Sequence, residues 1–274
     1  MPIPLSLRRL HEQRLSWAID GYQSFLEEMD PDVRTLMAGG DTNSSNAVVY
    51  GPTQVGKTTL ILRLLGITES DQRPISRVLR GGSALGNSAT ALPTAYHVVD
   101  DNKWQITGID GGLYRLSSRE ATEHLGRARA SIMTGAASSA RPLRIGIPHT
   151  IARPDASDAL LTTIFDLPGV DARSAAERDY VERIAPALIY NADLVLLVGR
   201  ADELGFAVPT KLAIEPLRDW ILAPERFRLV LTHACKPGTA QDAIKDSVRF
   251  DLAAARRYFI QEMMTHDYPP AVRG

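Results

Sequence analysis

The chain has 274 residues, of which 44 % are apolar and 23 % are charged, and its formal net charge is −1. Such a length predicts one large domain or two small ones, and a near-neutral charge excludes a general nucleic-acid binder, which needs a basic excess. With one cysteine, Cys235, no recognisable signal peptide and no apolar run of about 18 residues, we expect a cytoplasmic protein without disulfides or a cysteine-based zinc site.

The first elements are predicted from apolar spacing. Apolar side chains recur at helical spacing up to Met29, which predicts an amphipathic helix over residues 5–29. After a turn-rich linker over 39–46, a short apolar run predicts a buried strand at 47–50, and a helix follows at 57–65. The polar, glycine-rich stretch 68–88 carries no predicted element. A hairpin is expected next, with strands at 95–99 and 104–106 around Asp100-Asp101-Asn102.

The rest of the chain alternates between strands and helices. The predicted strands cover 143–147, 160–165, 194–198 and 227–231. The predicted helices cover 118–134, 175–190, 209–221 and 244–264. This alternation is typical of an α/β fold in which helices cover both faces of a mostly parallel sheet.

A glycine-rich segment between the strand at 47–50 and the helix at 57–65 fits the pattern G-x-x-x-x-G-K-[ST] at every position. Its backbone N–H groups and the start of the helix would cradle phosphate oxygens. Lys57 would bridge the β- and γ-phosphates, and the Thr58 hydroxyl would bind Mg²⁺. The sequence therefore predicts a P-loop NTPase fold. The residues expected at the nucleotide are Gly51, Pro52, Thr53, Gln54, Val55, Gly56, Lys57, Thr58 and Thr59.

A second motif, Asp-Leu-Pro-Gly, follows the apolar strand at 160–165. Asp166 at the end of a buried strand beside the P-loop would hold a water on Mg²⁺. The N–H group of Gly169 would reach the γ-phosphate and couple the loop to the nucleotide state.

In the order of its motifs the chain resembles the dynamin-like large GTPases, over roughly residues 48–237. The resemblance rests on GPTQVGKT, then Thr90-Ala91-Leu92-Pro93 before a strand, then DLPG, the apolar strand ADLVLLV and the strand end Leu231-Thr232. It implies that Thr90 is the switch threonine that binds Mg²⁺, with Thr58 and Asp166 completing the metal site. It also implies GTP as substrate, self-association or a protein partner, and a peripheral place at a membrane.

The base-reading motif departs from that family. The family's pattern is Thr/Asn-Lys-x-Asp, whereas this chain has Thr232-His233-Ala234-Cys235. A cysteine cannot accept the hydrogen bonds that the aspartate takes from guanine, so ATP remains an alternative to GTP. Thr232 and His233 are the residues expected beside the base.

The machinery for attack on the γ-phosphate is less defined. Val170 follows Gly169, so the glutamine that orients the attacking water in small GTPases is absent there. By the resemblance, Gln54 in the P-loop is the candidate for that task, together with Lys57 and Thr90. Three arginines near the P-loop, Arg63, Arg77 and Arg80, lie close enough in sequence to supply an arginine finger, and spacing does not choose among them.

We expect a helical segment over 1–40 and a GTPase-like domain over 41–274 that lacks the family's last strand and stalk. The predicted function is binding and hydrolysis of a nucleoside triphosphate as a nucleotide-dependent assembly switch. Two alternatives stay open: an interaction or scaffold module that binds nucleotide with little hydrolysis, and an ATPase.

Overall fold

The computed structural model describes two compact units, Met1–Thr42 and Asn43–Gly274. In the first unit four residues are described, 21, 24, 27 and 28; all four are helical and exposed, and the rest of the helix predicted at 5–29 lies outside the described residues. In the second unit the described residues are 45–82, 93–108, 110–133, 142–152, 162–167, 185–218, 220, 222–223, 225–234, 252–266 and 268.

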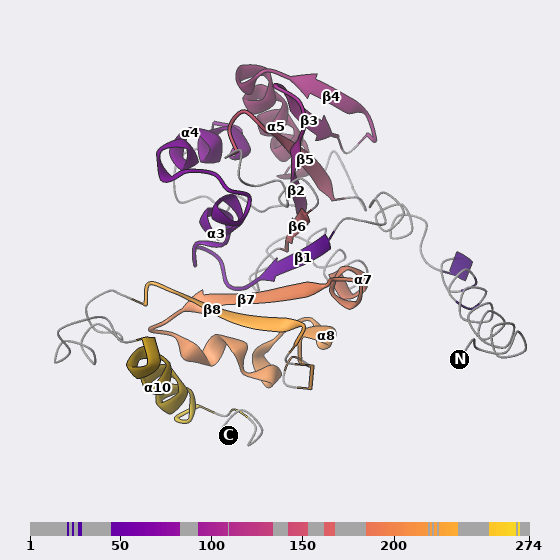
Figure 1. The fold of residues 1–274 in the computed structure, drawn as a ribbon. Coiled ribbons are helices and arrows are strands. Elements are labelled where there is room, and N and C mark those ends of the chain that lie inside the picture. Colours follow the sequence, from indigo (N-terminus) through magenta and orange to yellow (C-terminus); the bar gives the residue numbers. More distant parts are fainter. Residues whose placement is uncertain are drawn as a thin grey trace, which may run out of the picture. The chain divides into compact units, whose positions relative to one another are not determined.

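The second unit is built on a mixed eight-stranded sheet with the order β4-β3-β5-β2-β6-β1-β7-β8 (Figure 1). Its strands are β1 (Ser45–Tyr50), β2 (Thr94–Val99), β3 (Trp104–Thr107), β4 (Leu113–Leu116), β5 (Leu143–Pro148), β6 (Thr162–Asp166), β7 (Leu194–Arg200) and β8 (Phe227–Thr232). The pairs β6–β1, β1–β7, β7–β8 and β2–β5 are parallel, and β2–β6, β3–β5 and β3–β4 are antiparallel. The predicted α/β class with a mostly parallel sheet is confirmed.

The helices cover the sheet from both sides. They are α3 (Lys57–Leu64), α4 (Glu69–Leu79), α5 (Ser118–Met133), α7 (Ala185–Tyr190), α8 (Glu215–Arg218) and α10 (Leu252–Met263), with 3-10 turns at Leu204–Ala207 and Pro209–Lys211. Side chains of α3, α4 and α5 share one apolar core with alternate strand residues such as Val49, Val98 and Ile145. The remaining strand residues, such as Val48 and Leu197, are buried on the other face, where α7 and α8 lie (Figure 1).

Three sequence predictions about these elements are corrected. The strands at 95–99 and 104–106 exist but form no hairpin, because β5 lies between β2 and β3. The helix predicted at 209–221 is broken into a 3-10 turn and the short α8, since Pro216 interrupts a longer hydrogen-bonded run. Helix α4 was not predicted at all, although Ile75, Val78 and Leu79 bury one helical face.

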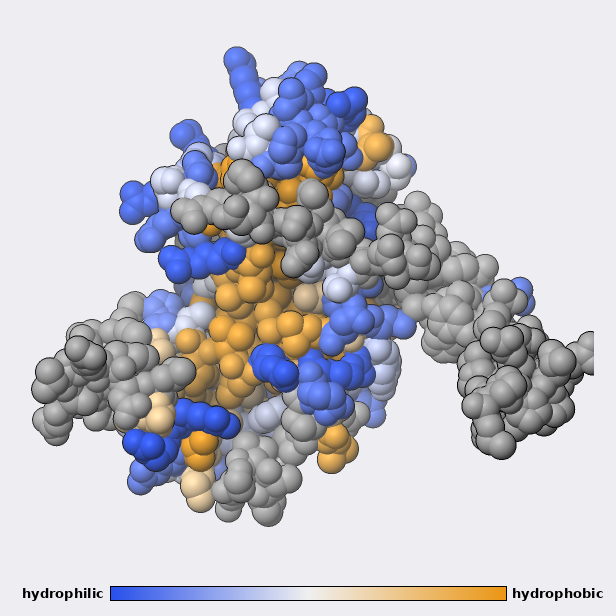
Figure 2. Space-filling model, viewed as in Figure 1, coloured by the Kyte–Doolittle hydropathy of each residue, from blue (hydrophilic) through white to orange (hydrophobic). Residues whose placement is uncertain are grey.

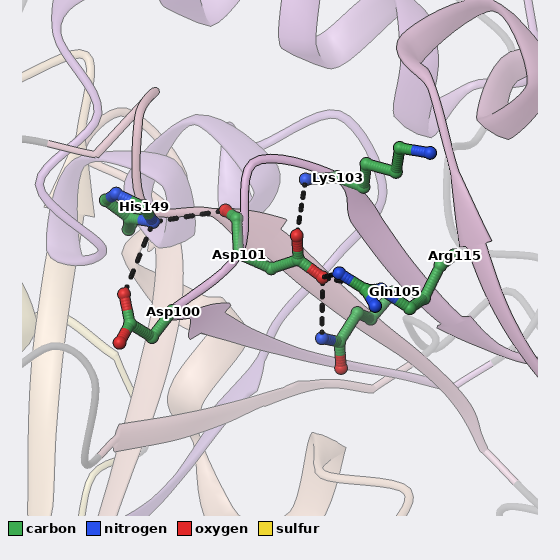
Figure 3. A network of polar contacts seen from close by, with 6 residues as sticks. All are labelled: Asp100, Asp101, Lys103, Gln105, Arg115 and His149. Carbon is green, nitrogen blue, oxygen red and sulfur yellow. Dashed lines mark hydrogen bonds and ion pairs between the residues drawn. The ribbon is translucent and has the colours of Figure 1, made fainter.

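A polar network at the turn after β2 holds the outer strands together (Figure 3). The Asp101 carboxylate accepts two bonds from Arg115 of β4, at 2.8 Å from Nε and 2.7 Å from Nη2. It also accepts a bond from the Gln105 amide of β3 at 3.2 Å. At the end of β5, the His149 backbone N–H donates to the Val99 carbonyl at 3.0 Å. The Asp101 carboxylate thus joins β3 and β4 to the turn after β2, and the His149 backbone bond joins the end of β5 to β2.

The visible face of the molecule carries an apolar area at its centre, over the place of α3, β1, β7 and β8 in Figure 1 (Figure 2). Leu60 of α3, Leu194 of β7 and Val230 of β8 are partly buried and pack against the core. Among the described residues, no helix is long and apolar enough to cross a membrane.

Acidification is expected to destabilise the fold through His97 of β2. Burial, with the nearby Arg144 charge, lowers the pKa of this imidazole to about 4, and its buried Nδ1 has no hydrogen-bond partner among the described residues. The folded pKa lies below the ordinary value near 6.5, so stability is complete above pH 6.5 and falls between 6.5 and 4, by at most about 3 kcal/mol. Urea unfolding at pH 7 and pH 4.5 should show a smaller loss in His97→Gln than in the wild type. An equal loss in both proteins would contradict this account.

Candidate nucleotide-binding site

The P-loop connects β1 to α3 as the sequence predicts. Gln54 and Gly56 take left-handed backbone angles, with φ of 63° and 94°, and these angles curl the loop back toward the start of the helix. The Gln54 side chain is exposed. Val55 is buried at 1 % exposure and anchors the loop in the core. Thr58 is half-buried in the first turn of α3, and Thr59 is exposed.

Gly51 is the position where the loop passes closest to the rest of the sheet. A Cβ added there would lie 1.9 Å from the Val198 carbonyl oxygen of β7, far inside van der Waals contact. Only glycine allows β1 to turn into the loop at this point.

Gly51→Ala is therefore expected to destabilise the fold by about 2–4 kcal/mol, because the clash is with backbone rather than with a flexible side chain. Gly21→Ala is the matched control, since its added Cβ would meet nothing within 4 Å. Thermal unfolding of both variants measures the difference. A Gly51→Ala protein as stable as the control would refute the assigned packing.

Lys57 is the first residue of α3 and its ammonium group lies over the loop. It donates hydrogen bonds of 2.8 Å to the carbonyls of Gly51 and of Pro52. Lys57 is only 6 % exposed. Burial lowers the pKa of the ammonium group, and the negative charge of Asp166 acts in the opposite direction. The site therefore contains a buried cation on α3 whose charged form is stabilised by the carboxylate at the end of β6.

Asp166 is the last residue of β6 and is fully buried. Parallel pairing sets it opposite Val49 of β1, one residue before that strand ends, and the next N–H group, of Leu167, donates to the Val49 carbonyl at 3.0 Å. The structure thus brings Asp166 to the edge of the sheet from which the P-loop leaves. The antiparallel strand β2 begins at the same edge, with Thr94 opposite Asp166.

The end of β8 lies on the other side of the P-loop. A Cβ added to Gly56 would lie 3.8 Å from the Thr232 methyl carbon. The Thr232 hydroxyl donates to the Gly199 carbonyl at 3.1 Å. His233 has a left-handed φ of 59°, and its Nδ1 lies 3.2 Å from the Thr232 hydroxyl. Of the two predicted base-contacting residues, Thr232 therefore lies at the loop, and His233 follows it in the chain.

A carboxylate that the sequence analysis did not single out also lies at this end of the site. Hydrogen bonds from Arg200 lower the pKa of Asp202 to about 2, with a smaller contribution from the charge of His233. Arg200 Nε lies 2.8 Å from the carboxylate. Asp202 lies two residues after the end of β7, so its place just beyond a predicted buried strand is the sequence signal that could have identified it.

Not every predicted site residue falls within the described part of the chain. Thr90 and Gly169 lie outside the described residues, as does Cys235. Of the arginines considered as fingers, Arg63 and Arg77 are exposed, and Arg63 lies 3.6 Å from Glu69 in an ion pair. Arg80 is half-buried.

The donors present suit a hard cation held jointly with a ligand. Among the described residues, no group of three or more His, Cys, Asp or Glu side chains could hold a metal by itself. Mg²⁺ is typically bound by one or two protein oxygens together with phosphates and water. The Asp166 carboxylate and the Thr58 hydroxyl fit that pattern.

Comparison with known proteins adds little to this picture. No protein-family model and no curated protein matches the chain. Two solved structures that match are described as an oligomerised bacterial dynamin pair that provides a mechanism for long-range sensing and tethering of membranes. Each is 12 % identical with a TM-score of 0.39; the matches cover 92 % and 97 % of this chain but 35 % and 44 % of those chains. The chain thus spans less than half of their length, and a TM-score this low assigns neither fold nor activity.

Proposed function

We propose that this chain binds a nucleoside triphosphate with Mg²⁺ and hydrolyses it to the diphosphate and phosphate, with GTP as the first candidate. The observation that carries the proposal is the buried Lys57 ammonium group on a P-loop, electrostatically supported by the buried Asp166 on the neighbouring strand. A buried cation and carboxylate at the C-terminal edge of a sheet are expensive to maintain in a merely structural role. They suit a site that receives phosphate oxygens and a metal ion.

Each candidate residue would have a separate role in hydrolysis. Lys57 and the P-loop amides would hold the β- and γ-phosphates and stabilise the charge that moves onto them. Thr58 and Asp166, with Thr90 as the third candidate, would hold Mg²⁺, which neutralises phosphate charge when bound. Gln54, exposed on the loop, would orient the attacking water, and the Gly169 N–H group would contact the γ-phosphate.

A second part of the proposal concerns which nucleotide base the site recognises. Thr232 lies beside the P-loop and supports a base-contacting role for Thr232 and His233, but the motif has Cys235 where a guanine-reading carboxylate is expected. ATP is therefore the second candidate substrate. Displacement of a fluorescent GTP analogue by GTP and by ATP decides between them. A GTPase requires tighter competition by GTP, whereas equal or tighter competition by ATP would favour the ATPase.

We further propose that the nucleotide controls assembly with a second copy or a protein partner, which can lie at a membrane. Phosphate release from GTP, measured across a range of protein concentrations, tests this. A rate per molecule that rises with concentration supports a self-assembling hydrolase. A flat rate near zero, with nucleotide still bound, would instead favour a scaffold module that binds without turnover.

A further inference from the structure

The end of β7 places a carboxylate beside the end of β8. Strands β1, β7 and β8 are neighbours in the sheet and run parallel, so they end at the edge from which the P-loop leaves (Figure 1). Arg200 of β7 pairs with Thr232 of β8, and the Ala201 N–H group donates to the Thr232 carbonyl at 2.9 Å. Asp202 therefore leaves β7 at the point where His233 leaves β8.

The Asp202 carboxylate is held in one orientation by Arg200. The guanidinium donates two hydrogen bonds to it, from Nε at 2.8 Å and from Nη2 at 2.5 Å. These bonds keep the pKa of Asp202 at about 2, so the group is ionised at neutral pH. The Asp202 side chain is still 39 % exposed. An ionised carboxylate has about four lone-pair sites, and the guanidinium uses only part of them, so the group can also accept hydrogen bonds from a ligand.

The two sides of the P-loop would face different parts of a bound nucleotide. Asp166 of β6 lies on one side of β1. As the proposed metal ligand it marks the γ-phosphate end, because Mg²⁺ bridges the β- and γ-phosphates. The ends of β7 and β8 lie on the other side of β1, where a Cβ added to Gly56 would lie 3.8 Å from the Thr232 methyl carbon. The nucleoside end of the ligand would therefore extend toward Thr232 and Asp202.

A carboxylate at that end of the site discriminates between the purine bases. The Watson–Crick edge of guanine presents two adjacent donors, N1–H and the exocyclic amine. Adenine presents one donor, its amine, beside the N1 lone pair, which is an acceptor. An ionised carboxylate only accepts hydrogen bonds, so it pairs with both guanine donors and repels the adenine N1. The group at the end of β7 therefore suits guanine better than adenine.

We propose that Asp202 reads the guanine base in this chain, in place of the carboxylate that the motif Thr232-His233-Ala234-Cys235 lacks. The Asp202 oxygens accept from N1–H and from the exocyclic amine. Arg200 is a positioning residue that fixes the carboxylate by its two hydrogen bonds. The inference rests on the nucleotide binding in the proposed function and names the base that this site selects. It does not depend on hydrolysis, because the base is recognised in the binding step.

Calorimetric titration with nucleoside diphosphates tests the assignment, because no release of the γ-phosphate accompanies their binding. The wild type should bind GDP about tenfold or more tightly than inosine diphosphate, which lacks the exocyclic amine. It should prefer GDP to ADP by at least the same factor. Asp202→Asn should weaken GDP by about tenfold or more and remove the preference over inosine diphosphate, because the amide offers one acceptor and places a donor against the second guanine donor.

Xanthosine diphosphate adds a measurement in which the variant gains affinity. Xanthine carries a carbonyl oxygen where guanine carries the exocyclic amine, so the Asp202 carboxylate repels it and an amide donates to it. Asp202→Asn should therefore bind xanthosine diphosphate about tenfold more tightly than the wild type does. An unfolded variant could not show this gain.

Glu203→Gln is the matched control, because it makes the same change from acid to amide at the exposed neighbouring residue. It should keep the selectivity of the wild type. Unchanged selectivity in Asp202→Asn, or an equal change in Glu203→Gln, would overturn the role of Asp202 while nucleotide binding stands. A wild type that prefers ADP to GDP would do the same. A wild type that binds none of the diphosphates would overturn the inference and the proposed function together.

Discussion

Lys57→Ala is expected to reduce phosphate release by about 10²–10³-fold and to weaken triphosphate binding. The ammonium group is buried at the P-loop and is the one described side chain that donates to both loop carbonyls, Gly51 and Pro52. Removing a preorganised charge-stabilising donor from an enclosed site commonly reduces turnover by that factor. Phosphate release at saturating nucleotide, with binding measured separately, gives the two effects.

Lys103→Ala serves as the matched control, because that side chain is exposed on the turn after β2 and the residue's bond to Asp101 comes from its backbone N–H group. Lys57→Arg adds a second comparison: it retains the charge but not the compact ammonium geometry. Wild-type turnover in Lys57→Ala would remove the basis of the hydrolytic function.

The sequence predicted that part of the site whose residues are close together along the chain. Strand β1, the loop and α3 follow one another within 20 residues (45–64), so an apolar run, a glycine pattern and a helical stripe were sufficient to place Lys57 and Thr58. Asp166 was predicted beside them because a buried strand preceded it, and the register with β1 places it there.

The parts that were mispredicted depend on contacts between distant segments. The expected hairpin fails because β5, more than thirty residues later, pairs with both β2 and β3. The sequence predicted no helix at α4, because Pro74 and the glycines that follow are typical of loops. In the structure the proline lies within the helix and Ile75 packs in the core. The packing of α4 against α5 could not be predicted, since it depends on the close approach of the Gly81 and Gly126 backbones.

Asp166→Asn is expected to reduce hydrolysis by about 10²-fold or more and to raise the Mg²⁺ concentration needed for half-maximal rate. The substitution conserves volume and removes the carboxylate charge, which the proposed metal site and Lys57 both use. Rates measured over a Mg²⁺ titration separate a metal defect from a general loss. Asp100→Asn, at an exposed carboxylate on the turn after β2, is the control.

The same variant makes a separate prediction about stability, because it removes the charge that supports Lys57. The pKa of Lys57 is already lowered from 10.5 by burial, and without Asp166 it should fall further. A folded pKa below the unfolded value means that the unfolded chain binds the proton more tightly, so stability rises as pH passes from the folded pKa to 10.5. Asp166→Asn should therefore lose stability at pH 7 and regain part of it by pH 9.5 in urea unfolding. Adding Lys57→Met should remove that pH dependence, and a pH-independent loss in both variants would show that the two side chains are not coupled.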